Sequence, residues 1–266
     1  MAGGVPLPLG AVTRHLVVLG RGRLGSALAR AVEGADGWTV RLEPGRGDAS
    51  RVDGADLVLL CVPDGAIAGV AAELPVDEGR VVGHCSGALG LDVLDPHPRR
   101  ASLHPLVSVP DAERGAIALS GGWAGVAGDA VAGELAAGLG MRTVAVPGDR
   151  RAAYHAAAVI ASNHLVGLLG QVERVAAGVG VPLEAFVDLA RGSLENAASM
   201  GPEAALTGPV SRGDWATVRS HLAVLPEDER SGYLCGARLA ARVAGRELPD
   251  VELPDSDGQP SGGTPR

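Results

Sequence analysis

The chain has 266 residues, a formal net charge of -8, 46% hydrophobic residues and 2% aromatic residues. This composition predicts a globular protein and argues against a nucleic-acid partner, because acidic balance and few aromatic rings suit neither phosphate binding nor base stacking. All 23 basic residues are arginines, so Schiff-base and lysine-base chemistry are excluded.

Cysteines and termini indicate the compartment. Cys61, Cys85 and Cys235 lie far apart with no CxxC pair and no HExxH motif accompanies them, so neither a disulfide scaffold nor a metal site is expected. Residues 1–13 lack the basic start and apolar core of a signal peptide. No apolar run reaches about 18 residues without glycine or charge. We therefore expect a cytoplasmic protein without a membrane span.

The first half alternates strands with helices, which predicts an α/β Rossmann domain over residues 14–147, with a mostly parallel sheet and helices on both faces. The expected strands are His15–Gly20, Trp38–Leu42, Asp56–Val62, Arg80–His84, Ala101–His104, Trp123–Ala127 and Arg142–Val146. The expected helices are Arg23–Glu33, about Gly65–Leu74 and about Asp129–Leu139.

An all-helical domain is expected over residues 150–247. Its helices are predicted at Arg151–Gly178, Pro182–Ser199, Asp214–Leu225 and Glu227–Ala244. The first of them is rich in alanine and glycine and is too apolar to be covered by those that follow, which predicts a homodimer through this domain. Residues 1–13 and 249–266 are expected to be flexible tails.

A GxGxxG motif closes the first strand and opens the first helix, a context typical of dinucleotide binding. It comprises Gly20, Arg21, Gly22, Arg23, Leu24 and Gly25. Gly20 permits the turn, Gly22 lets the backbone approach a pyrophosphate, and Gly25 lets the helix pack on the strand. Arg21 and Arg23 oppose the helix dipole unless an anion binds there. The alternative is a plain glycine-rich connection.

The end of the second strand bears on the choice between NAD and NADP. Glu43 stands where an acid would bind a ribose 2′-hydroxyl and select NAD. Arg41 and Arg46 flank it and suit a 2′-phosphate, so both cofactors stay open, with NADP slightly preferred. Val62 and Pro63, at the end of the third strand, are expected to line the same site.

Polar residues also end the middle strands, where ligands of open sheets bind. Asp64 is expected to cap the next helix, with a ribose contact as the alternative. His84 and Ser86 flank Cys85, and Ser86 either binds substrate or caps a turn near Leu89. His104 serves either packing or the site.

The helical half carries a second polar set. His155 and Ser162 are seven residues apart and share a helix face, and Asn163 lies one step round. Asn196 and Arg212 follow, and Arg212 is free to clamp a substrate carboxylate. The alternative is an alanine-rich packing helix with incidental polar groups.

These motifs together resemble a known family. The segments GRGRLG, VPD, HCSGA, HPL, YHAAAVIASN and LTGPVSRGD resemble Rossmann-like oxidoreductases whose helical half is the domain of unknown function 2520. The resemblance runs from about His15 to Ala244. It implies kinship with pyrroline-5-carboxylate reductases and beta-hydroxyacid dehydrogenases, and some members are implied to be alternative ketopantoate reductases of pantothenate synthesis. The catalytic lysine of the dehydrogenases, four residues before an asparagine, is replaced here by Val159.

The resulting hypothesis is an NAD(P)-dependent oxidoreductase that reduces a small 2-oxo acid, with ketopantoate as the best candidate. The alternatives are an imine reductase of the pyrroline-carboxylate kind and a non-catalytic dinucleotide sensor. With no lysine, a histidine is expected to donate the proton, since its pKa lies near neutrality. His155 is favoured because the wider family places catalysis on its helix, with Tyr154, His84 and His104 as alternatives.

Overall fold

The computed structural model describes residues 13–249, so the expected tails lie almost entirely outside the described residues. Seven strands form one sheet in the order β2-β1-β3-β4-β5-β6-β7. They are β1 (Arg14–Leu19), β2 (Trp38–Glu43), β3 (Leu57–Leu60), β4 (Val81–His84), β5 (Arg100–Pro105), β6 (Trp123–Gly128) and β7 (Arg142–Ala145). All neighbours pair in parallel except β5 and β6, which are antiparallel.

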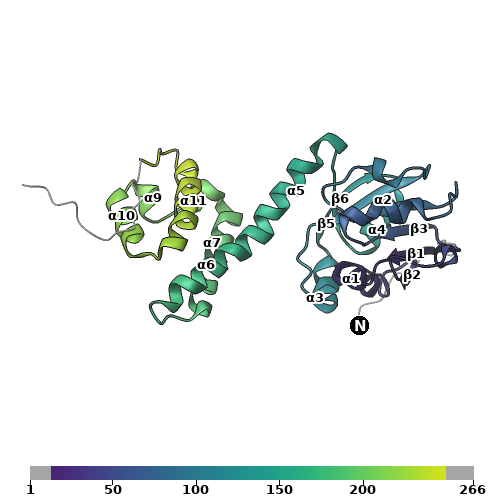
Figure 1. Ribbon diagram of the computed structural model, residues 1–266, viewed down its shortest axis with the longest axis horizontal. Helices are drawn as coiled ribbons and strands as arrows, with labels where there is room; N and C mark the ends of the chain where they lie inside the picture. The colour runs from purple at the N-terminus through teal and green to yellow at the C-terminus, as the bar shows by residue number, and fades with distance from the viewer. Residues whose placement is uncertain (1–12, 250–266) are drawn as a thin grey trace, which may run out of the picture. The chain divides into compact units, whose positions relative to one another are not determined.

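Each face of this sheet is covered by its own hydrophobic core, and Figure 1 shows the helices that lie around the sheet. Along β1, Leu16 and Val18 point to one core, whereas Val17 and Leu19 point to the other, which is the two-residue period of a strand buried on both faces. The first core includes helices α1 (Arg23–Val32), α3 (Ala112–Leu119) and α4 (Val131–Gly138). The second includes α2 (Asp64–Ala72) and the 3-10 turns η1 (Ala49–Val52) and η2 (Leu91–Leu94). The expected doubly covered sheet is confirmed.

The strand order fixes where a ligand can bind. The chain leaves β1 for β2 on one side, then crosses to β3 on the other, so the connections that follow β1 and β3 run in opposite directions. Such a switch point opens a crevice at the carboxyl ends of the two strands. Residues 20–25 and 61–64 lie at these ends.

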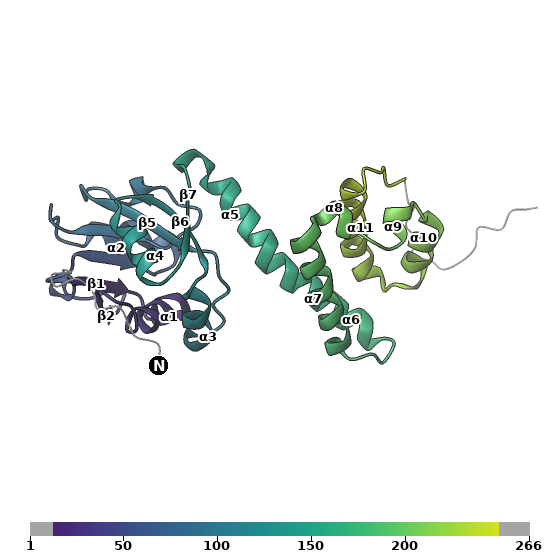
Figure 2. The ribbon, with the colours of Figure 1, turned by 180° about the vertical axis from the view of Figure 1, so that it is seen from behind.

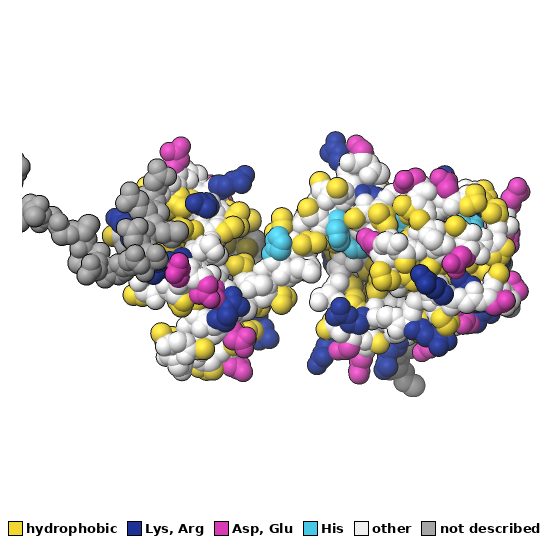
Figure 3. Space-filling view, viewed as in Figure 1, with side chains coloured by type: hydrophobic (Ala, Val, Ile, Leu, Met, Phe, Trp, Pro, Cys, Tyr) yellow, Lys and Arg dark blue, Asp and Glu magenta, His cyan; other side chains and the backbone are white. Residues whose placement is uncertain are grey.

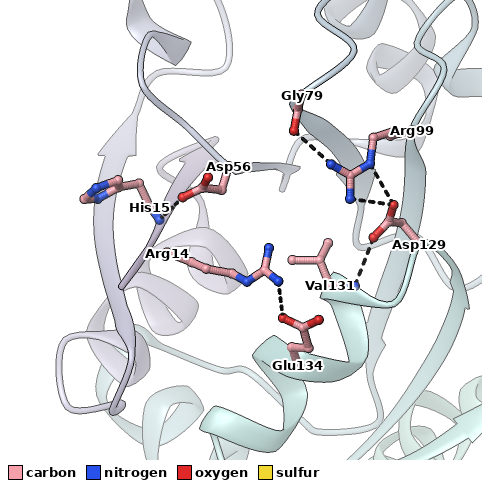
Figure 4. A network of polar contacts seen from close by, with 8 residues as sticks. All are labelled: Arg14, His15, Asp56, Gly79, Arg99, Asp129, Val131 and Glu134. Carbon is pink, nitrogen blue, oxygen red and sulfur yellow. Dashed lines mark hydrogen bonds and ion pairs between the residues drawn. The ribbon is translucent and has the colours of Figure 1, made fainter. Parts of the chain in front are cut away.

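At the amino ends of the strands, opposite the crevice, charged side chains form ion pairs and hydrogen bonds, which Figure 4 shows. The guanidinium of Arg99 donates to the Asp129 carboxylate at 3.0 Å and to the Gly79 carbonyl at 2.9 Å. Arg14 pairs with Glu134 of α4 at 2.7 Å. These contacts join the amino ends of the strands to their helices, away from the carboxyl-end crevice.

Helix α3 is missing from the elements expected from sequence. Asp111 caps it by accepting a hydrogen bond from the backbone N–H of Arg114 at 2.8 Å. The helix packs on α1, and Gly115 lets the two approach, because a Cβ there would lie 2.7 Å from Ala27 Cβ. Its short apolar stretch between Pro110 and Gly121 carries too few helical turns to stand out by periodicity.

Compactness divides the chain into residues 1–162 and 163–266. The expected division lay at residues 147–150, ahead of helix α5 (Arg151–Val159). The difference arises because α5 packs on the sheet through Arg151 and Tyr154. A π-helical turn, η4 (Ile160–His164), follows α5 and contains the division.

The second unit is helical, as expected, and Figure 2 shows it from behind. It comprises α6 (Leu165–Ala177), α7 (Leu183–Met200), α8 (Pro202–Ala205), α9 (Pro209–Arg212), α10 (Trp215–Val224) and α11 (Glu227–Val243). Its core is small and is formed by α9, α10 and α11 through Val210, Val218, Leu222, Leu234, Ala237 and Ala241. Helix α6 joins α11 through the ion pair of Arg174 with the buried Glu229.

One helical run within residues 13–249, Gly148–Ala177, is long and apolar enough to cross a membrane, with a mean hydropathy of 1.3. The expectation that no segment qualifies is therefore corrected, because glycine is nearly neutral in hydropathy and does not interrupt the run. This run meets the criteria for a membrane span by length and composition alone, and a helix that leaves an apolar face uncovered outside a membrane meets them as well.

Candidate functional site

The glycine loop after β1 is built around close backbone contacts. Gly20 has φ +121°, and a Cβ there would lie 2.3 Å from the Cys61 carbonyl oxygen. A Cβ on Gly25 would lie 1.9 Å from the Gly20 carbonyl oxygen. Only glycine fits both positions, so the turn and the helix–strand packing predicted from the motif are confirmed.

Gly22 differs, because no atom lies within 4 Å of a Cβ built there. It is the N-cap of α1, no side chain caps this helix end, and its first turn contains no acidic residue. Backbone N–H groups at the end of α1 therefore face open space with their partial positive charge. This is the arrangement that a pyrophosphate would fill.

The end of β2 lies beside this loop, since the Gly20 N–H donates to the Glu43 carbonyl at 2.9 Å. The Glu43 carboxylate pairs with Arg41 at 3.3 Å and lies 3.9 Å from Arg21. Arg41 also donates to the Arg51 carbonyl at 2.7 Å, so it is occupied. Arg46 is exposed in the following loop, and Arg21 is an exposed cation beside Glu43.

A pocket of about 440 Å³ opens at the crevice, and its size lies in the range of small-molecule sites. It joins the glycine loop to the ends of β3, β4 and β5. Its lining is Gly22, Arg23, Leu24, Cys61, Val62, Pro63, Asp64, Cys85, Ser86, His104, Pro105, Val107 and Val109. The structure therefore brings together the residues predicted for the cofactor with two of those predicted for chemistry, Ser86 and His104.

Ser86 and Asp64 form a rigid turn in the pocket wall. The Ser86 hydroxyl donates to the Asp64 carboxylate at 2.8 Å and accepts from the N–H groups of Ala88 and Leu89. Ser86 therefore closes the turn near Leu89, the alternative that the sequence left open. Asp64 is not the N-cap of α2, which is Pro63, because its carboxylate serves Ser86.

His84 is fully buried and both ring nitrogens have backbone partners. Nδ1 accepts from the Ser86 N–H at 3.2 Å, and Nε2 donates to the Gly90 carbonyl at 3.0 Å. Burial is the main cause that lowers the pKa of His84, so the ring stays neutral. It orders the turn, and no ring nitrogen is left for a substrate.

His104 lines the pocket and is backed by Tyr154 of α5. Its Nδ1 lies 2.8 Å from the Tyr154 hydroxyl, which also accepts from the Gly125 N–H. When the phenolic hydrogen is donated to Nδ1, the hydrogen of a neutral imidazole lies on Nε2. Burial, followed by His155 and Arg151, lowers the pKa of His104 to about 4, so the neutral form prevails at neutral pH.

His155 lies beside His104, with the ring centroids 5.7 Å apart and the planes nearly perpendicular. Its Nδ1 is buried and has no hydrogen-bond partner. Gly87 separates the two rings from the Ser86 turn, since a Cβ there would lie 2.5 Å from His155 Nδ1 and 2.8 Å from His104 Nε2. The glycine of the HCSGA segment therefore makes room for both histidines.

Arg151 is buried behind this group and forms no ion pair in the described structure. It donates to the Ser86 carbonyl at 2.5 Å and to the Ser102 hydroxyl at 2.8 Å, whereas its Nε and Nη1 have no partner. Burial lowers its pKa from the ordinary value. Arg151, Tyr154 and His155 follow the i, i+3, i+4 spacing of one helix face, which is the signal in the sequence that would have added Arg151 to the predicted site.

The remaining predicted residues lie at the end of the first unit or in the second unit. Ser162 lies in the π-helical turn, where its hydroxyl donates to the Ala158 carbonyl at 2.7 Å, and Asn163 follows it. Asn196 on α7 and Arg212 on α9 are exposed in the second unit. Asp214 caps α10 as expected, by accepting from the Thr217 N–H. Within residues 13–249, no group of three or more His, Cys, Asp or Glu side chains is placed to hold a metal ion.

Family models match most of the chain in two adjoining parts. Residues 46–110 match a Rossmann-like domain, and residues 124–239 match the Domain of unknown function (DUF2520). A comparison with curated proteins finds no significant match.

Solved structures share the fold over nearly the whole chain. BF3122 from Bacteroides fragilis, described as an NADP oxidoreductase, has TM-score 0.73 and 18% identity, covering 87% of this chain and 99% of that one. Protein TM1727 from Thermotoga maritima has TM-score 0.66 and 26% identity, covering 86% and 98%. A 1-pyrroline-5-carboxylate reductase from Streptococcus pyogenes has TM-score 0.61 and 14% identity, covering 86% and 98%. Residues 46–110 are therefore similar to a Rossmann-like domain, and residues 124–239 are similar to the domain of unknown function 2520.

Proposed function

We propose that this protein is an oxidoreductase that uses NADP or NAD to reduce the C=O or C=N bond of a small 2-oxo or imino acid. The observation that carries the proposal is one pocket lined both by the open amino end of α1 and by a neutral histidine, His104. The structural neighbours described as an NADP oxidoreductase and a pyrroline-carboxylate reductase support the reaction class.

The residues present fit a dinucleotide. Gly22 leaves space where a pyrophosphate would lie, and the N–H groups of α1 would hold its charge. Arg23 adds a cation in the pocket wall, and Val62 and Pro63 would support the adenosine side. When bound, the nicotinamide supplies the hydride.

His104 is the residue that we assign as proton donor. Reduction of a ketone places negative charge on oxygen, which needs a hydrogen-bond donor and then a proton. In this proposal the donor is Nε2–H of His104, a residue of the pocket lining, and the Tyr154 hydroxyl at Nδ1 passes its hydrogen forward as Nε2 releases one, after which the phenolate regains a proton from water. Ser86 and His84 are committed to the turn, so His155 is the second candidate.

The charge around the site favours an anionic substrate. Arg151 is a buried cation that forms no ion pair within residues 13–249, and Arg23 lines the pocket, so these two cations outnumber the one carboxylate of the lining, that of Asp64. A carboxylate beside the reacting carbon would gain from this field. Ketopantoate, a 2-oxo acid, is our first substrate, and a cyclic imino acid is the alternative that the Streptococcus pyogenes neighbour favours. Arg212 remains the predicted clamp for the carboxylate.

A substrate panel tests the proposal. We expect oxidation of NADPH or NADH, followed by absorbance, with ketopantoate, other 2-oxo acids or pyrroline-5-carboxylate. His104→Gln should lower kcat about 100-fold or more with unchanged cofactor affinity, whereas His155→Ala should cost less. Cofactor binding without turnover of any substrate in the panel would instead indicate a dinucleotide sensor. Greater loss in His155→Ala would return the donor role to His155.

A homodimer formed by the helical half is part of the proposal. Large hydrophobic side chains are exposed there, among them Ile160, Val166 and Leu168, with 59%, 68% and 49% of their surface accessible. Figure 3 shows hydrophobic side chains at the surface along this run. A second copy would cover them and would account for the hydropathy of Gly148–Ala177 without a membrane, in a cytoplasmic protein. Light scattering should give twice the chain mass for wild type and the monomer mass for Val166→Glu; a wild-type monomer at micromolar concentration would reject the dimer.

A further inference from the structure

Two cysteines meet in the floor of the pocket, although they are 24 residues apart in sequence. The thiol of Cys61, just after β3, donates to the Sγ of Cys85, just after β4, over 3.5 Å. Both side chains line the pocket, and neither forms a disulfide. The proposed reaction uses neither of them.

The backbone geometry suits a covalent link. Leu60 is in register with His84, so Cys61 and Cys85 are the next pair along adjacent parallel strands. The Cys85 N–H still donates to the Leu60 carbonyl at 3.3 Å, which shows that the ladder continues to this point. Neighbouring strands lie about 4.8 Å apart, within the range of about 4.4–6.8 Å between the Cα atoms of disulfides.

Cys61 also supports the glycine loop directly. Its carbonyl oxygen is the atom that a Cβ on Gly20 would strike at 2.3 Å, and its own Cβ would lie 3.3 Å from a Cβ on Gly25. Closing the sulfur–sulfur distance from 3.5 Å to about 2.05 Å therefore pulls on the residue against which the loop is packed. The open, tightly turned loop described above belongs to the dithiol form.

We propose that Cys61 and Cys85 form a redox-responsive dithiol that hydrogen peroxide converts to a disulfide, and that this disulfide lowers the affinity of the pocket for a dinucleotide. The second part rests on the proposed function. The thiolate of Cys61 attacks the peroxide, the O–O bond breaks, water is released, and a sulfenic acid forms. Cys85 sulfur then displaces the second water to form the S–S bond, so two thiols and one peroxide give one disulfide and two waters.

The environment of the two thiols limits the rate at which they are oxidised. The hydrogen bond with Cys85, together with burial, raises the pKa of the Cys61 thiol well above its ordinary value, so oxidation should be slow at neutral pH and faster in mild alkali. A bound dinucleotide would cover the pocket and protect both thiols. Because linkage is reciprocal, a cofactor that disfavours the disulfide must bind the disulfide form less tightly by the same factor.

The test uses the full chain with Cys235→Ser, which leaves the pair as its only thiols. After hydrogen peroxide treatment we expect both thiols to be lost with an intact mass lower by two hydrogens, and dithiothreitol should restore them. The matched Cys61→Ser/Cys85→Ser chain, which keeps the exposed Cys235, should instead gain oxygen or dimerise. NADP⁺ should slow disulfide formation about fivefold or more. Its Kd should rise about fivefold or more in the oxidised chain, which is the factor by which NADP⁺ shifts the dithiol–disulfide equilibrium.

Other outcomes overturn the proposal in separable ways. Oxygen addition at each cysteine without an intramolecular disulfide, in the wild type as well as in the variant, would reject the dithiol. A disulfide that leaves a measurable NADP⁺ affinity unchanged would reject the coupling. A disulfide in a chain that binds neither NADP⁺ nor NAD⁺ would also reject the coupling and would contradict the proposed function, while the dithiol itself would stand.

Discussion

Substitutions in the glycine loop give the most specific test, because Gly22 is expected to face the cofactor whereas Gly25 packs against the loop itself. In Gly22→Asp the new side chain enters open space, since no atom lies within 4 Å of the Cβ position and the backbone φ of -73° suits any residue. In Gly25→Ala a single methyl group meets the Gly20 carbonyl oxygen at 1.9 Å. We predict that the first change removes dinucleotide binding and preserves the fold, whereas the second damages the fold.

The magnitudes follow from these contacts. A Cβ needs at least 3.0 Å from a backbone oxygen, so Gly25→Ala forces a movement of over 1 Å in the loop. Overpacking of this kind costs about 3 kcal/mol or more of unfolding free energy. Aspartate in place of glycine at an N-cap instead stabilises a helix by a few tenths of a kcal/mol. Its carboxylate would repel a pyrophosphate, and like charges about 4 Å apart at an effective dielectric near 20 repel by about 4 kcal/mol, enough to weaken binding about 100-fold or more.

Urea denaturation and calorimetric titration with NADPH measure the two effects separately. Gly69→Ala in α2 is the matched control, because its Cβ meets no atom within 4 Å and alanine favours a helix by about 0.5–1 kcal/mol. Unchanged NADPH affinity in Gly22→Asp would refute the assignment of this helix end to the cofactor. Wild-type stability in Gly25→Ala would refute the packing argument.

The remaining predictions concern the pocket and the opposite edge. The folded pKa of His104, about 4, lies below the ordinary value of 6.5, so the unfolded chain binds the proton first and stability falls as pH drops from 6.5 towards 4. His104→Gln should flatten the decline in urea-unfolding free energy between pH 7 and pH 5, part of which remains through His84; an unchanged slope would contradict the shift. Tyr154→Phe removes the hydroxyl that faces His104 Nδ1, so the imidazole hydrogen is no longer held on Nε2. This change should lower kcat about tenfold and leave the Kd for NADPH unchanged, and full turnover would exclude a proton relay through Tyr154. Asp129→Asn weakens the half-exposed pair with Arg99 and should cost about 0.5–1 kcal/mol of stability without altering NADPH affinity, since that edge lies away from the pocket. A changed affinity would show that the two edges are coupled.

The sheet and the cofactor loop were predictable because their signals are local. Continuous apolar runs such as Leu57–Leu60 indicate strands buried on both faces, and the spacing of Gly20, Gly22 and Gly25 states which backbone positions must lack a side chain. Helix α3 gave a weaker signal because eight residues provide barely two turns. The antiparallel pairing of β5 with β6 depends on how α3 returns the chain, which no single segment encodes.

The chemistry of the pocket was harder to predict, because it depends on partners distant in sequence. Nothing near His84 reveals that both ring nitrogens are engaged, and nothing near His104 reveals the hydroxyl of Tyr154, 50 residues away. The sequence therefore favoured His155, which helical spacing makes conspicuous. The meeting of Cys61 with Cys85 likewise requires strand register, which only the folded sheet provides.

Transfer of a label from the cofactor tests the central claim most directly. NADPH carrying deuterium on the reactive carbon of the nicotinamide is incubated with the protein and with each 2-oxo or imino acid of the panel. The account predicts that deuterium appears on the former carbonyl or imine carbon of one product, and that His104→Gln slows the transfer without changing where the label goes. Tight NADPH binding with no deuterium in any product would contradict the assignment of this pocket to reduction of this substrate class.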